Sequence, residues 1–150
     1  MAITRILTAL LLLSPIQAWC AYDADEIKEN ISNNPTLFKV TEWKTSDNNS
    51  WHATTSLKRV KISVNKDKAK FIAPFINPKQ MKTGKSLCEE FGAIATKSID
   101  KASRDLIKET IRKATTRHRI VFITLNDVKF SVIPKLIGVV VSLHCSAIAT

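Results

Sequence analysis

Hydrophobic and polar residues alternate through much of the first half of the chain, which is typical of half-buried β-strands. Residues 36–45 are rich in β-branched and aromatic side chains, and residues 51–57 alternate from Trp51 onward. The polar run 46–50 between them consists of residues that favour turns. The two segments are therefore predicted to form a hairpin.

The alternation resumes one residue out of step at Val60, Ile62 and Val64. A shift of one residue turns every following side chain to the opposite face of a sheet. We therefore expect a bulge or a strand break near Lys58-Arg59.

A short helix is predicted near residue 23. Asp23 and Glu26 have the spacing of a capping box, and Ile27 and Ile31 then share one helical face. Pro35 disfavours the helical conformation of the residue before it, so the helix should end at residues 33–34. A helix this short needs docking against the rest of the protein to be stable.

The second half of the chain predicts one long helix over residues 86–115. Ser86 and Glu89 again have capping-box spacing, and they directly precede an apolar run with helical periodicity. The positions that share the face are Leu87, Phe91, Ile94, Ala95, Ala102 and Leu106.

The C-terminal segment is strand-like throughout. Residues 120–125 and 128–133 predict a hairpin around Asn126-Asp127, and Pro134 is expected to end its second strand. Residues 136–145 are almost continuously apolar, which favours a strand buried in the middle of a sheet. The run is cut by polar residues at its end, so a membrane span is disfavoured.

The N-terminal stretch, Met1–Cys20, has the layout of a secretory signal peptide. Arg5 precedes an apolar run at residues 6–13, which Ser14-Pro15 interrupts. Cleavage after Ala18 or after Cys20 is consistent with the sequence, and cleavage after Cys20 leaves an even number of cysteines. The bulky Trp19 disfavours a lipid anchor on Cys20.

Two cysteines remain in the expected mature chain, residues 21–150, which we predict to be a single domain. Cys88 lies in the first turn of the predicted long helix, and Cys145 ends the last strand. A disulfide between them is typical of exported proteins. The alternative is a reactive thiol at Cys88, because a helix N-terminus lowers the pKa of a cysteine. His144 is next to Cys145, but strand neighbours point to opposite faces.

Together these elements predict an α+β fold with one disulfide. A mostly antiparallel sheet of about five strands would pack the long helix at 86–115 on one face. The short N-terminal helix would close an edge or an open face of the sheet.

The chain of 150 residues is strongly basic, with a formal net charge of +10. Residues 58–85 contain nine basic residues and one acid, Asp67. Such a stretch is suited to nucleic acid, to anionic envelope polymers or lipid, or to an acidic protein, and it also occurs where charge serves solubility alone. Export disfavours nucleic acid as the partner.

The segment 66–84 has the least regular pattern, with two prolines and lysines on both sides of an apolar core, and is predicted to be a long loop. Apolar loop residues ringed by lysines are typical of contacts with a protein or a membrane surface. The alternative is that the apolar residues fold back over the core. The candidate partner-binding residues are Lys66, Lys68, Lys70, Phe71, Phe75, Ile76, Lys79 and Lys82.

The sequence offers no convincing catalytic, metal or cofactor site. His52, His118 and His144 lack the spacing of metal ligands. Residues 83–86 resemble the end of a phosphate-binding loop, but Lys79 stands where that pattern requires its first glycine. A helix cap, with an anion as a possible ligand, is the better interpretation of residues 83–86.

We therefore expect an exported, non-enzymatic binding protein, secreted or periplasmic, that docks a protein partner. It would be an accessory factor of an envelope machine, or an inhibitor or immunity protein. The first alternative is a cationic protein that binds an anionic envelope polymer or lipid. The second is a small hydrolase or a thiol enzyme that uses Cys88. No pattern indicates an oligomeric state.

Overall fold

The computed structural model describes residues 22–46 and 48–150. The expected signal peptide, with both cleavage positions and Cys20, lies outside the described residues.

The described residues form one antiparallel sheet of seven strands with the order β1-β2-β3-β4-β7-β6-β5. The α+β class is confirmed, but the expected number of about five strands is too low. A strand in the centre of the sheet, β4, comes from the segment that we expected to be a loop. The strands are β1 Val40–Thr45, β2 Trp51–Thr55, β3 Lys61–Val64, β4 Lys68–Phe75, β5 Val121–Leu125, β6 Val128–Ile137 and β7 Val140–Ala149.

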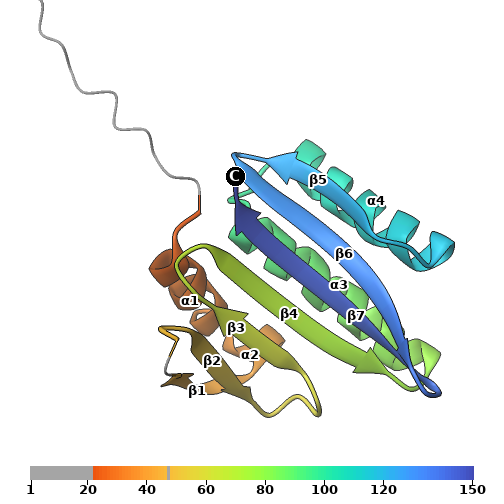
Figure 1. Cartoon of the computed structure of the whole chain (residues 1–150), viewed down its shortest axis with the longest axis horizontal. Coiled ribbons are helices and arrows are strands. Elements are labelled where there is room, and N and C mark those ends of the chain that lie inside the picture. Colours follow the sequence, from red (N-terminus) through yellow and green to blue (C-terminus); the bar gives the residue numbers. More distant parts are fainter. Residues whose placement is uncertain (1–21, 47) are drawn as a thin grey trace, which may run out of the picture.

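Four helices pack on one face of this sheet, and Figure 1 shows them together behind it. Their bounds are α1 Ala24–Ser32, α2 Pro35–Phe38, α3 Pro78–Ala95 and α4 Lys101–Arg117. Helix α3 packs against β4 and β7, whereas α4 packs against β5 and β6. The hydrophobic core therefore lies in a single layer between the helices and the sheet.

The N-terminal helix begins as the sequence predicted. The Asp23 side chain accepts a hydrogen bond from the Glu26 backbone N–H at 3.0 Å, and Ile27 and Ile31 are fully buried. The indole N–H of Trp43 in β1 also donates to the Ser32 hydroxyl at 2.8 Å. These contacts dock the short helix against the core and the sheet, which its length requires.

The predicted helix over residues 86–115 is wrong, because the chain breaks it into α3 and α4. Lys97 takes a left-handed backbone conformation, with φ of 51°, and the Asp100 side chain accepts from the Ser103 N–H at 2.8 Å to begin α4. The predicted apolar face does not continue across the break, because Ala102 and Leu106 are exposed and α4 instead buries Ile107, Ile111 and Ala114. The change of buried face between residues 95 and 107 reflects the break between the two helices.

Helix α3 also starts before the predicted cap at Ser86, which lies inside the helix. The Asn77 side chain accepts from the Gln80 N–H at 2.9 Å, and the Gln80 amide oxygen accepts from the Ile76 N–H at 2.8 Å. The first bond is an N-cap hydrogen bond, and the second differs from a capping box because its N–H belongs to Ile76, the residue before the N-cap. The expected anion site at residues 83–86 consequently has no helix N-terminus.

Of the predictions for the two ends of β6, one is confirmed and the other is wrong. The hairpin between β5 and β6 is confirmed, with Asn126 and Asp127 at φ of 49° and 58°. The expectation that Pro134 ends β6 is wrong, since the strand continues to Ile137 and Pro134 pairs with Leu143. The continuous strand expected over 136–145 is also wrong, because the chain turns at Gly138, whose φ is 62°.

The core centres on aromatic rings from three separate elements. Phe71 of β4 lies between Phe38 and Phe91, with ring centroids 6.4 Å and 5.9 Å apart respectively. All three side chains are fully buried.

The break expected near Lys58-Arg59 is confirmed as the turn between β2 and β3, in which Arg59 has φ of 64°.

Candidate functional site

The face of the sheet opposite the helices carries no other element of the described chain, and it faces the viewer in Figure 1. Strand alternation decides which residues it presents: in β4, Ala69 and Phe71 point to the helices, so Lys68 and Lys70 point away. We call this surface the open face. Its lysines are Lys44, Lys61, Lys68, Lys70, Lys129 and Lys135.

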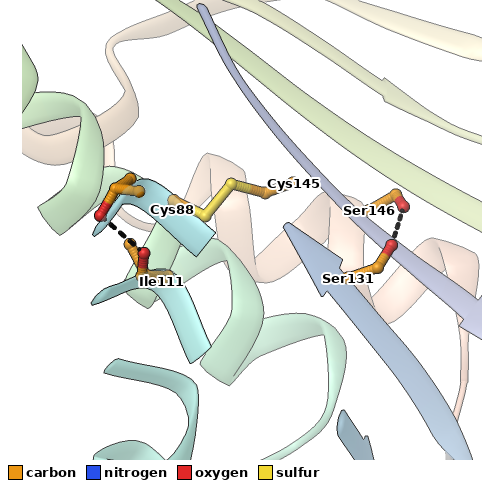
Figure 2. Close-up of a disulfide and its surroundings, with 6 residues drawn as sticks. Cys88, Ile111, Ser131, Cys145 and Ser146 are labelled. Atoms are coloured by element: carbon orange, nitrogen blue, oxygen red, sulfur yellow. Dashed lines mark hydrogen bonds between the residues drawn. A yellow bond between two sulfur atoms is a disulfide. The ribbon is translucent and has the colours of Figure 1, made fainter. Parts of the chain in front are cut away.

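The strand register aligns polar side chains across the open face from β1 to β6, in a row that ends at an aromatic side chain in β5. Lys70 pairs with Ser63 on one side and with Ser146 on the other, and Ser146 pairs with Ser131. The hydroxyls of Ser131 and Ser146 lie 2.8 Å apart, on the side of β7 away from Cys145, as Figure 2 shows. The register continues this row to Lys44, His52 and Phe122.

Charge is distributed unequally between the two sides of the molecule. Within the described residues, Glu42 is the carboxylate of the open face, and it pairs with Lys44 at 3.5 Å. Carboxylates of the helical layer pair with helical or linker cations, such as Glu90 with Arg104 at 2.7 Å. Five lysines of the open face make no ion pair with any described residue: Lys61, Lys68, Lys70, Lys129 and Lys135.

Apolar side chains occupy positions between these lysines. Ile72 and Ile133 are half-buried, and their strands flank His144 of β7. Phe122 is 57% exposed, and the Lys129 ammonium lies 4.3 Å from the centre of its ring. The open face thus combines aliphatic and aromatic surface with unpaired cations.

The pKa of His144 reflects its position between half-buried apolar side chains and lysines. Partial burial lowers the pKa of His144 below its ordinary 6.5, and the positive charges of Lys135 and Lys70 lower it further. Burial also lowers the pKa of Lys68, with a second contribution from Lys70. Burial is the larger cause of both shifts, and the nearby lysine charges act in the same direction. The His144 Nε2 lies 3.0 Å from the Ser142 hydroxyl, so one of the two donates to the other.

The segment expected to bind a partner is divided among three places. Phe71 and Phe75 are 0% and 4% exposed, so their expected role as surface contacts is wrong and the alternative, that they pack into the core, holds. The long loop expected over 66–84 is also wrong, because its alternating residues form β4 and the rest opens α3. Lys68 and Lys70 lie on the open face, Lys66 lies in the β3–β4 turn, and Ile76, Lys79 and Lys82 lie at the start of α3 or just before it.

Sequence reasoning did not identify the other contributors to the open face: Lys44, Lys61, Phe122, Lys129, Lys135 and His144. A signal for one of them was present, because residues 128–132 alternate strictly between apolar and polar. That pattern places Lys129 and Ser131 on a face away from the core. This alternation could not predict that the same face of the neighbouring strands is also left uncovered.

A cleft of about 390 Å³ lies at one end of the molecule, between the β2–β3 turn and the first turns of α3. Leu57, Val60 and Ile76 contribute aliphatic surface to it. Its cations are Lys58, Arg59 and Lys79, and none of its lining residues is acidic.

The predicted disulfide is confirmed. Cys88 of α3 and Cys145 of β7 are bonded across the core, with Cα atoms 6.1 Å apart, and both are buried (Figure 2). In this state neither sulfur is a nucleophile, so the structure does not support the thiol-enzyme alternative.

The described residues contain no cluster of three or more His, Cys, Asp or Glu side chains suited to a metal ion. None of the helices in the described ranges is long and apolar enough to cross a membrane.

Comparison of the chain with protein-family models, with curated proteins and with solved structures found no match.

Proposed function

We propose that this chain is a binding protein that docks an acidic protein partner on the open face of its sheet. The observation that carries the proposal is the separation of charge: among the described residues, the six lysines of the open face share one carboxylate, Glu42, and five of them make no ion pair, whereas the helical layer contains many carboxylates, some of them paired with its cations. Unpaired lysines on one surface attract and orient a negatively charged partner.

A protein fits this face better than a purely ionic polymer does. Ile72, Ile133 and Phe122 provide apolar contact area between the lysines. Protein interfaces combine an apolar centre with a polar rim in this way. A hydrophilic polyanion would leave the apolar area exposed to water and would gain only the charge contacts.

We also propose that the protein acts outside the cytosol, in a secreted or periplasmic location, as an accessory factor of an envelope machine or as an inhibitor. The signal-peptide pattern of Met1–Cys20 supports export. The Cys88–Cys145 disulfide is compatible with an oxidising compartment.

The proposal is tested by comparing two charge-reversal variants of equal net charge in affinity capture from the native compartment. The first variant, K61E/K70E, changes exposed lysines of the open face, and the second, K101E/K108E, changes exposed lysines of α4. We expect the first variant to lose the partner and the second to retain it. Capture by the wild type should weaken as salt concentration rises, because exposed charges are screened.

Equal loss of the partner by both variants would contradict the proposal, since it would show dependence on net charge and not on the open face. Retention of the partner by both would contradict it as well. Thermal unfolding of each variant provides the control for folding.

A further inference from the structure

The hairpin between β6 and β7 ends in aliphatic side chains that lie in solvent. Leu136 is 73% exposed, Ile137 is 64% exposed and Val139 is 97% exposed. Gly138 makes the turn between them, with φ of 62°. We call Leu136, Ile137 and Val139 the apolar tip.

Folding does not require these residue types at a hairpin tip. The same chain joins β5 to β6 with Asn126-Asp127, both in the left-handed conformation that a tight two-residue turn uses. Polar residues of that kind are stable in water, whereas exposed aliphatic side chains gain nothing from folding. The contrast between two hairpins that share β6 points to a role for the apolar tip outside the fold.

The apolar tip extends past the strands on either side of it. Strand β5 pairs with β6 only as far as Val132, and β4 pairs with β7 only as far as Val141. Leu136 and Ile137 are consecutive in β6, so they point to opposite faces of the ribbon, yet both are exposed. No helix or other strand of the described residues covers the tip, and Figure 1 shows the hairpin end projecting at one end of the sheet.

Positive charge accompanies the apolar tip. Lys135 directly precedes it and is exposed, and the last 23 residues of the chain, 128–150, contain no acid. Ile76, at 62% exposure, directly follows the neighbouring strand β4, and Lys79 and Lys82 lie in the first turns of α3, at the same end of the sheet (Figure 1).

We propose that the apolar tip inserts into the interfacial layer of a membrane that contains anionic phospholipids. A bilayer surrounds an inserted group on all sides, which suits a tip that exposes aliphatic side chains on both faces of its ribbon. A protein partner would have to enclose the tip in a deep pocket. Lysines beside interfacial apolar groups interact with anionic headgroups while the apolar groups enter the acyl boundary. The anchor is shallow and reversible, unlike a membrane-spanning segment.

Fluorescence of an introduced tryptophan tests this directly in the purified protein. V139W places the reporter at the apolar tip, and T124W places it at an exposed position of β5 away from the tip. We expect phosphatidylcholine vesicles with about 30% phosphatidylglycerol to shift the emission of V139W to the blue, and bromine-labelled lipid to quench it. The emission of T124W should not change when the vesicles are added. Both variants contain the same native tryptophans, so the native background is equal in the two measurements.

A sedimentation assay with the same vesicles gives a second readout. V139D should lower the partition coefficient about tenfold or more, because an ionised carboxylate is disfavoured in the acyl boundary. Val139 is 97% exposed, so V139D should leave the thermal unfolding midpoint of the protein unchanged.

Three results would overturn the inference: no binding of the wild type to anionic vesicles at low salt, equal binding of wild type and V139D, or equal quenching of V139W and T124W. The proposed docking of a protein on the open face is tested by K61E/K70E and partner capture. Each experiment can therefore contradict its own proposal while the other proposal remains supported.

Discussion

Phe75 of β4 packs directly on the backbone of α3 at Gly84. A Cβ atom built on Gly84 would lie 1.9 Å from Cε1 of the Phe75 ring, far inside any tolerated contact. The absence of a side chain at Gly84 therefore allows α3 to approach the end of β4. This contact explains two residues that sequence patterns assigned elsewhere, Phe75 to a binding loop and Gly84 to a helix cap at residues 83–86.

Substitution of Gly84 by alanine should overpack this contact. We expect G84A to lower the free energy of unfolding by about 1–3 kcal/mol, the usual range for an extra methyl group in a packed core. Urea unfolding measures the change. In the F75L background, where the ring is absent, G84A should cost clearly less, and equal costs in the two backgrounds would contradict the packing described here.

Both prolines that misled the strand prediction lie where one neighbouring strand has already ended. Pro74 lies in β4 beyond Ile72, the last residue that pairs with β3, and Pro134 lies in β6 beyond Val132, the last that pairs with β5. A missing N–H is tolerated where one side of a strand is free. The lengths of neighbouring strands depend on tertiary structure, so local sequence could not show that these prolines were permitted.

The disulfide should contribute substantially to stability because it closes a long loop. Cys88 and Cys145 are separated by 57 residues, for which chain-entropy arguments give about 4 kcal/mol. The variant C88A/C145A should lose about that much free energy of unfolding, as measured by urea denaturation. Reduction of the wild type should give a similar loss, and an unchanged midpoint in both cases would contradict the assignment.

The start of α3 at Asn77 predicts different effects for two capping candidates. N77A removes the side chain that accepts from the Gln80 N–H and should cost about 1 kcal/mol, the typical value for an N-cap. S86A changes an exposed residue inside the helix, where alanine is the best helix former, and should be neutral or slightly stabilising. Thermal unfolding compares the two, and a larger cost for S86A would favour the helix start predicted from sequence.

His144 should report the potential of the open face. Its pKa is below 6.5 in the folded protein, so the unfolded chain takes up a proton first as the pH falls. The contribution of His144 to stability is thus present above pH 6.5 and is lost between 6.5 and its folded pKa. K70Q should raise the pKa of His144, because it removes a nearby positive charge, while burial keeps the pKa below 6.5.

NMR titration of the imidazole protons measures this change. K101Q removes the same charge from α4 and serves as the matched control, since Lys101 lies in the helical layer. Equal pKa values of His144 in wild type and K70Q would show that the lysines of the open face do not act on it.

Sequence patterns predicted the first helix and the β5–β6 hairpin because each depends on local chemistry. The fold class followed from the periodicity of the segments, and the disulfide from the two cysteines of the expected mature chain. The open face was not predictable in the same way. Lys44, Lys70 and Lys129 come from strands far apart in the sequence and share one face only through the strand order. Whether any element covers that face is likewise a property of the whole fold, so the site became visible only in three dimensions.

Photo-crosslinking from two matched positions tests most directly whether the open face is the docking surface. Phe122 lies on the open face at 57% exposure and Leu106 lies on α4 at 50%, so each tolerates replacement by p-benzoylphenylalanine. In the native compartment, we expect position 122 to crosslink the acidic protein that the wild type captures and position 106 to give no crosslink to it. Crosslinks to that protein from position 106 alone, or from both positions equally, would contradict docking on the open face.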